Sequence, residues 1–131
     1  MAAENVGPGG RVAGVDLAPI DPPLKLDLVC AMQGDLAASS VVPVLLDFLG
    51  RRADVLLCDA APKLTGVRAS DRAREEALLE AVAAALAELL LPGGLALVKL
   101  LDGPEAQAFE KRIRHSFSQS RKVRPKASRK G

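Results

Sequence analysis

Short apolar runs alternate with longer segments of helical periodicity along the chain. The runs at 11–17, 26–33, 53–58 and 95–101 are bounded by glycine, proline or aspartate, as is typical of buried strands. The segments between and after them predict helices from Ser39 or Ser40 to about Leu49, from about Ser70 to Leu91, and from Pro104 to about Phe117. Residues 122–124 predict the start of one more strand.

The predicted helix at 70–91 has the strongest signal, because it is rich in alanine, leucine and glutamate. Ser70 or Asp71 is expected to cap its start, and Pro92–Gly94 to end it. Its apolar stripe consists of Leu78, Leu79, Val82, Leu86 and Leu89. In the preceding helix, Pro43 is compatible with helical structure only in the first turn.

This alternation predicts an α/β fold with a parallel sheet, helices on both faces and right-handed crossovers. A length of 131 residues favours a single domain, residues 1–131, with one core. No apolar run approaches the roughly 20 residues that cross a bilayer, so we expect a soluble protein with no membrane segment. Ligands of such sheets bind beyond the carboxyl ends of the strands.

Three of the predicted strands end in an acid at that edge: Asp16, Asp35 and Asp59. An ionised carboxylate only accepts hydrogen bonds, so Asp16 is suited to the ribose hydroxyls of a nucleoside cofactor. Asp35 is placed to accept from an adenine amino group. Each of the three is also compatible with an ordinary polar strand end or a helix cap, and this alternative stays open.

Lys99 interrupts the apolar run at 95–101. A cation inside an apolar strand is costly to desolvate unless it has a partner or reaches solvent. The order of the two runs and the single helix between them predict that the strands of Asp59 and Lys99 are neighbours. Because neighbouring strands lie about 4.8 Å apart, Asp59 is the natural partner. A structural ion pair and a reactive pair explain Lys99 equally well. His115, by contrast, is expected to be a surface residue at a helix end.

The formal net charge of +2 conceals a strong asymmetry. Residues 1–110 contain all 16 acidic and 9 of the 18 basic residues and carry −7, whereas residues 111–131 carry +9. Such a segment favours a polyanion partner, although a solvated, frayed end remains an alternative. Tyr and Trp are absent, so contacts to RNA are expected mainly at phosphate. The candidate RNA-binding residues lie in the basic tail at 118–131: Arg121, Lys122, Arg124, Lys126, Arg129 and Lys130.

The two cysteines, Cys30 and Cys58, lie in apolar runs and are interpreted as core residues. Their spacing matches neither a metal motif nor a disulfide framework, so no metal site is expected.

Several of these segments together resemble, in order and spacing, the FtsJ-type RNA 2'-O-methyltransferases. The similarity covers nearly the whole chain, and the phrases at 50–54 and 124–130 are most similar to the branch that methylates large-subunit ribosomal RNA, including mitochondrial members. The segments are GVDLAPIDP at 14–22, QGD at 33–35, ADVLLCDAAP at 53–62, LPGG at 91–94, VK at 98–99 and KASR at 126–129.

The resemblance implies a Rossmann-like fold that binds S-adenosyl-L-methionine and transfers its methyl group to a ribose 2'-hydroxyl of ribosomal RNA. It implies that Asp16 binds the cofactor ribose, Asp35 the adenine and Asp59 the methionine end. Asp59 and Lys99 would also be two members of the family's Lys-Asp-Lys-Glu catalytic tetrad, with Lys99 orienting or deprotonating the hydroxyl.

The chain also departs from the family pattern. The glycine-rich loop after the family's first, central strand has no counterpart, nor have the first tetrad lysine and the glutamate expected shortly after Ser128. Lys63 and Cys58 stand where the family usually has Asn and Ser. We therefore expect the first and last strands to be missing and the sheet to be marginal or gapped, since each lost ladder hydrogen bond removes about 1 kcal/mol.

We also expect negligible methyl transfer by the isolated chain. Incubation with labelled S-adenosyl-L-methionine and unmodified rRNA tests this, and turnover comparable to that of a full-length relative would contradict it. A catalytically inactive, RNA-associated module is the alternative function, and it predicts salt-dependent RNA binding without cofactor binding. A nucleotide-dependent oxidoreductase is less supported, because no G-x-G-x-x-G turn follows a strand.

The partner implied is large-subunit ribosomal RNA or a pre-ribosome, bound by a monomer. The first ten residues contain no targeting signal. The resemblance implies a mitochondrial location in a eukaryote, with the cytoplasm as the alternative.

Overall fold

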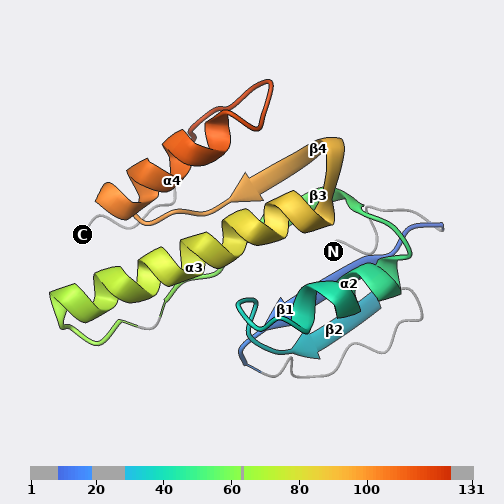
Figure 1. Cartoon of the computed structure of the whole chain (residues 1–131), viewed down its shortest axis with the longest axis horizontal. Helices are drawn as coiled ribbons and strands as arrows, with labels where there is room; N and C mark the ends of the chain where they lie inside the picture. Colours follow the sequence, from blue (N-terminus) through green and yellow to red (C-terminus); the bar gives the residue numbers. More distant parts are fainter. Residues whose placement is uncertain (1–8, 19–28, 63, 125–131) are drawn as a thin grey trace.

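The computed structural model describes residues 9–18, 29–62 and 64–124, and these form an α/β structure. Strands and helices alternate as the hydrophobic pattern predicts, and every pair of strands is parallel. The elements shown in Figure 1 are β1 (Val12–Asp16), β2 (Val29–Gln33), α2 (Val41–Leu49), β3 (Ala53–Cys58), α3 (Arg68–Leu89), β4 (Leu90–Val98) and α4 (Pro104–Arg114).

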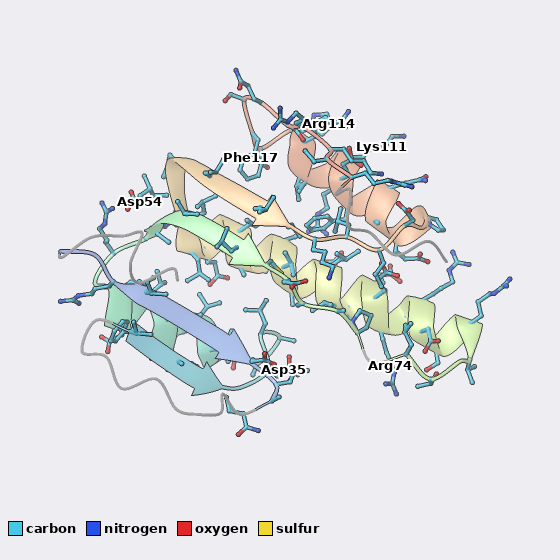
Figure 2. All side chains as sticks on the ribbon, turned by 180° about the vertical axis from the view of Figure 1, so that it is seen from behind. Asp35, Asp54, Arg74, Lys111, Arg114 and Phe117 are labelled. Carbon is cyan, nitrogen blue, oxygen red and sulfur yellow. The ribbon has the colours of Figure 1, made fainter. Side chains whose placement is uncertain are left out.

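The strands form two separate two-stranded sheets. Among the described strands, β1 pairs only with β2, and β3 only with β4. Figure 2 shows the strands in the order β2, β1, β3, β4, all pointing the same way, with a break between β1 and β3. Within the described ranges no strand bridges that break, so the expectation of a gapped sheet is confirmed.

The helices among the described residues lie on one face of these sheets, whereas cover on both faces was predicted; the crossover from β1 to β2 lies outside the described residues. Helices α2 and α3 pack against each other, and both contact the strands on that face. The crossovers from β2 to β3 and from β3 to β4 run in the same direction across the molecule. Two right-handed crossovers in one direction place their helices on the same side, which explains the difference.

Helix α3 is the centre of the core. Its buried residues are Leu79, Val82, Ala85, Leu86 and Leu89, four of which belong to the predicted stripe. Leu78 is only partly buried. One cluster joins α3 to Phe109 of α4 and to the β3–β4 sheet, and a second joins it to Val41 and Leu45 of α2. Through α3 the two sheets share one continuous packed layer.

The alternate side chains of the β3–β4 sheet point to the opposite face, where no described residue covers them. Leu57, Leu95 and Leu97 are each 66% exposed there, and Val55 is 51% exposed. They stand in register as the pairs Val55↔Leu95 and Leu57↔Leu97. We call these four residues the open face.

The Pro92–Gly94 segment lies inside β4, so its predicted role as the end of α3 is wrong. Helix α3 ends at Leu89, and the register shifts between Ala53 and Val55 to accommodate the proline and glycines. Gly93 has a φ of +83°. A Cβ on Gly94 would lie 2.9 Å from the carbonyl oxygen of Asp54 and 2.7 Å from Cδ1 of Leu90. Only glycine fits where β4 approaches β3 so closely.

Two helix boundaries and one predicted strand differ from the predictions. Helix α3 begins at Arg68 with Val67 at the N-cap, because the carboxylate of Asp71 bonds to the preceding loop rather than capping the helix. Helix α4 begins at Pro104 as predicted but ends at Arg114. Residues 122–124 form no strand. In α2, Ser40 occupies the N-cap and Pro43 lies in the first turn, as predicted.

Candidate active site

The carboxyl ends of β1 and β2 carry the first two predicted aspartates. Asp16 is the last residue of β1, and its backbone oxygen accepts a hydrogen bond from the Gly34 N–H at 2.8 Å. Its Oδ1 accepts from the Ala18 N–H at 3.0 Å, and Oδ1 of Asp35 accepts from the Ala37 N–H at 2.9 Å. Both side chains are exposed, and these bonds fix one oxygen of each carboxylate while the other stays available to a ligand.

The carboxyl ends of β3 and β4 carry Asp59 and Lys99. The backbone N–H of Lys99 donates to the Cys58 oxygen at 2.9 Å, which continues the ladder one residue beyond the strand. Nζ of Lys99 lies 3.1 Å from Oδ1 of Asp59. The predicted pairing is therefore present, formed by the first residue after each of two neighbouring strands.

The surroundings of Lys99 differ from those predicted. Strand β4 ends at Val98, so Lys99 does not interrupt the strand, and its side chain is 67% exposed beside an Asp59 side chain that is 78% exposed. The desolvation cost expected of a cation within an apolar strand therefore does not apply, because both charges remain in water.

All four charged residues lie along the same side of the molecule. The four strands point in one direction in Figure 2, and each of these residues follows or ends a strand. We call Asp16, Asp35, Asp59 and Lys99 the strand-end site. Its two halves are separated by the break between β1 and β3.

Asp71 fixes the loop that leads from Asp59 to α3. Its Oδ1 accepts hydrogen bonds from the backbone N–H and the hydroxyl of Thr65, both at 2.7 Å, and its Oδ2 accepts from the Gly66 N–H at 3.1 Å. These bonds, chiefly the one from the Thr65 N–H, lower the pKa of Asp71 below its usual value. From the sequence, Asp71 was instead a candidate cap for the helix that follows this loop.

The basic segment after α4 is tied to the body by ion pairs. Arg124 pairs with Asp102 at 2.9 Å, and Nζ of Lys122 lies 4.0 Å from Glu110. Arg121 has no ion pair among the described residues and is exposed. The other three predicted RNA-binding residues, Lys126, Arg129 and Lys130, lie outside the described residues.

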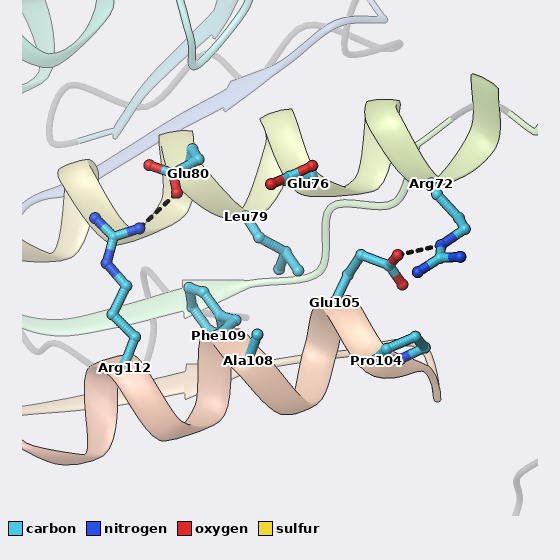
Figure 3. Close-up of a pocket in the computed structure, with 9 residues that line it drawn as sticks. All are labelled: Arg72, Glu76, Leu79, Glu80, Pro104, Glu105, Ala108, Phe109 and Arg112. Carbon is cyan, nitrogen blue, oxygen red and sulfur yellow. Dashed lines mark hydrogen bonds and ion pairs between the residues drawn. The ribbon is translucent and has the colours of Figure 1, made fainter. Parts of the chain in front are cut away.

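A groove of about 330 Å³ lies between α3 and α4 (Figure 3). Leu79 and Phe109 contribute apolar surface, and Arg72–Glu105 and Arg112–Glu80 ion pairs bridge the two helices. The Arg72 hydrogen bond lowers the pKa of Glu105 and raises that of Arg72. No residue of the strand-end site lines this groove, which is a helix interface bridged by charges.

Three further observations concern the cysteines, metal-ligating groups and membrane-spanning helices. Cys30 and Cys58 are free and partly buried; Cys58 packs against the core as predicted, whereas Cys30 belongs to neither core cluster. No group of metal-ligating side chains occurs in the part of the chain that the structure describes. The helices described there include none that is long and apolar enough to cross a bilayer.

Comparison with known proteins places this geometry in a family. A family model described as FtsJ-like methyltransferase matches residues 1–131. The chain is 37% identical over 129 residues to a protein of Desulfatibacillum aliphaticivorans named ribosomal RNA large subunit methyltransferase E, covering 98% of this chain and 61% of that protein.

Two further relatives carry the same name. The protein of Cenarchaeum symbiosum is 35% identical, with 99% of this chain and 64% of the relative covered. The protein of Nitrosomonas europaea is 37% identical, with 98% and 62% covered. The chain thus spans about three fifths of the length of these relatives. It belongs to the FtsJ-like methyltransferase family.

Proposed function

We propose that this chain carries the cofactor-binding and reacting residues of an S-adenosyl-L-methionine-dependent methyltransferase that modifies a ribose 2'-hydroxyl of large-subunit ribosomal RNA. The observation that carries the proposal is the exposed Lys99–Asp59 pair, placed at the ends of two adjacent parallel strands on the same side as Asp16 and Asp35. Family membership and the names of the relatives support it.

The β1–β2 half suits the nucleoside part of the cofactor. Asp16 offers an acceptor to the two ribose hydroxyls, and Asp35 offers one to the adenine amino group. Their hydrogen bonds to Ala18 and Ala37 fix each carboxylate before any ligand arrives. A carboxylate that is already oriented loses less conformational freedom on binding. When bound, the cofactor supplies an electrophilic methyl group on a sulfonium centre.

The β3–β4 half suits the acceptor hydroxyl. The Lys99 ammonium, held by Asp59, has further N–H donors that can orient the oxygen of a ribose hydroxyl toward the methyl group. On transfer the sulfonium would leave as a neutral thioether, and the hydroxyl proton would pass to the other Asp59 oxygen or to water. Asp59 holds this ammonium through the ion pair, and it would also contact the methionine end of the cofactor, as the family resemblance implies. Because both residues follow neighbouring strands, their relative position is set by the β3–β4 ladder rather than by a loop.

The basic segment suits the RNA backbone. Arg121, Lys122 and Arg124 are exposed, and Arg124 is held at the loop that follows Lys99. Guanidinium groups bind phosphate oxygens through paired hydrogen bonds, and such contacts are independent of base sequence. The choice of nucleotide would then depend on other parts of the enzyme.

A chimera tests the proposal, because the chain spans only part of its relatives. Residues 1–131 replace the matching segment of the Nitrosomonas europaea protein, and methyl transfer to unmodified large-subunit rRNA is measured with labelled cofactor. We expect activity, a loss in kcat of about 10²- to 10⁴-fold for Asp59→Asn or Lys99→Met, and a raised cofactor KM for Asp16→Asn. Asp54→Asn is the matched control and should leave both parameters unchanged.

The outcomes distinguish the two functions considered. An active chimera that keeps its rate with Lys99→Met contradicts the assigned reacting residues. A folded chimera that binds RNA in a salt-dependent way but neither binds the cofactor nor transfers methyl groups instead supports the RNA-associated module.

A further inference from the structure

An ion pair outside the strand-end site joins the segment after α4 to the loop that follows Lys99. Nη2 of Arg124 is 2.9 Å from Oδ2 of Asp102. Asp102 lies three residues after Lys99, and three extended residues span at most about 10 Å. The ion pair therefore holds Arg124 at the loop that continues from Lys99, although the two basic residues are 25 positions apart in the sequence.

Most of the basic side chains in this region form ion pairs with carboxylates of the chain itself. Among the six basic residues between 111 and 124, only Lys111 and Arg121 have no ion pair within the described residues. The other pairs are Arg112–Glu80, Arg114–Glu110, Lys122–Glu110 and Arg124–Asp102. Asp102 alone of these acids lies on the loop that continues from Lys99. The cation held at this loop is thus neutralised by the protein itself.

The Arg124–Asp102 pair is suited to an exchange in which a phosphate replaces the Asp102 carboxylate. Its two side chains are 75% and 71% exposed, and exposed pairs of this kind contribute little to stability. A phosphodiester presents the guanidinium with the same kind of acceptor as a carboxylate. An incoming phosphate can therefore replace Asp102 without disturbing the core.

We propose that Asp102 pairs with Arg124 in the free chain, on the loop that continues from Lys99, and that an RNA phosphate bound beside Lys99 displaces Asp102 from the guanidinium. The inference rests on the proposed function, since it takes RNA as the polyanion. Charge complementarity supports it: the chain after residue 110 carries +9, and one of its cations is held at the loop that follows Lys99. Asp102 keeps the guanidinium at that loop and competes with the phosphate for it.

Binding measurements on the 131-residue chain test the exchange. Fluorescence anisotropy is recorded with a labelled large-subunit rRNA fragment and, in parallel, with labelled inorganic polyphosphate. Because Asp102→Asn removes the competing carboxylate, we expect binding of both probes to tighten about 2- to 5-fold, with a gain that shrinks as salt rises. Arg124→Gln should weaken binding, and in that background Asp102→Asn should have almost no effect.

Asp54→Asn is the matched control, because Asp54 forms an equally exposed pair with Arg51 away from the basic segment. It removes the same charge, so a comparable gain from Asp54→Asn would show a general charge effect and overturn the exchange. An equal gain from Asp102→Asn in the Arg124→Gln background would overturn it too. Circular dichroism confirms that each variant is folded.

The two probes separate this inference from the proposed function. Coupling between Asp102 and Arg124 with polyphosphate, together with no rRNA binding, would support the exchange and contradict rRNA as the partner. Absence of coupling with both probes would overturn the exchange, while the cofactor site and the chimera's activity would be unaffected.

Discussion

The two faces of the β3–β4 sheet are made by alternate residues of the same two strands, yet their surroundings are opposite. On one face Leu56, Cys58, Ala96 and Val98 pack against the core beneath α3. On the other, the open face of Val55, Leu57, Leu95 and Leu97 is more than half exposed. Their side chains are equally apolar, so composition does not explain the difference.

The difference follows from topology. Helices α2 and α3 come from successive crossovers in one direction, so they cover the same face. Parallel strands are normally buried on both faces, and an apolar patch of cross-strand pairs usually marks a surface that another element covers. Within the described residues, the packing that stabilises this sheet therefore lies on one face, and the strand-end residues are exposed.

The sharpest test of this comparison is a pair of truncations. Leu86→Ala, beneath the covered face, should lower the free energy of unfolding by about 2–5 kcal/mol, because it leaves a cavity at a side chain that is only 7% exposed. Leu57→Ala, on the open face, should change it by less than about 0.5 kcal/mol. Urea denaturation of both variants measures the difference, and equal losses would show that the open face is covered.

A smaller effect is expected where β4 crosses closest to β3. Gly94→Ala places a methyl group 2.9 Å from the Asp54 carbonyl oxygen, so it should cost about 1–3 kcal/mol through backbone displacement. Gly14→Ala in β1 is the control, because nothing lies within 4 Å of its added Cβ. If both substitutions are equally tolerated, the close approach of β4 to β3 is incorrect.

Charges on the open face should alter association more than stability. Leu57→Lys and Leu97→Lys each replace a side chain that is 66% exposed, so the free energy of unfolding should change by no more than about 0.5 kcal/mol. Self-association, followed by light scattering, should fall because the apolar patch is interrupted. A loss of 2 kcal/mol or more would instead mean that these leucines are buried in solution.

The smallest effect is expected from the loop that leads to α3. Hydrogen bonds from Thr65 and Gly66 lower the pKa of Asp71, so this carboxylate stabilises the fold at any pH above its usual value of about 3.9. That contribution is lost as the pH falls further and the group becomes protonated. Unfolding midpoints of Asp71→Asn should therefore approach those of the wild type below pH 4.

Asp47→Asn is the control, since Asp47 makes no hydrogen bond among the described residues. Burial raises the pKa of Glu75, so its effect on the pH dependence of stability is opposite to that of Asp71. Glu75 is present in every variant, so its effect cancels in the comparison. A constant difference between Asp71→Asn and the wild type at every pH would contradict the role given to the ionised carboxylate.

Much of the fold could be predicted from hydrophobic pattern because burial imposes it directly. The runs around Val15 and Leu56 and the stripe of α3 gave the correct elements. The end of α3 was misplaced because Pro92–Gly94 usually stops a helix, whereas here it forms an irregular crossing of two strands. The contact between Gly94 and Asp54 determines the conformation of this segment, and local sequence propensities carry no information about that contact.

The strand-end site was predictable for a different reason. In a parallel sheet all strands end on the same side, so residues that end apolar runs are brought together whatever the loops do. The pairing of Asp59 with Lys99 followed from neighbouring strands. The pairing of Asp102 with Arg124 did not, because it depends on the path of the chain after α4, which hydrophobic periodicity does not determine.

The most direct test of the central claim, that one line of strand ends binds the cofactor, is a titration of the ¹⁵N-labelled chain with S-adenosyl-L-methionine followed by NMR. The account predicts saturable shifts at the amides next to Asp16, Asp35 and Asp59, and their loss in Asp16→Asn. Shifts confined to the groove between α3 and α4, or none at the strand ends at saturating cofactor, would contradict it.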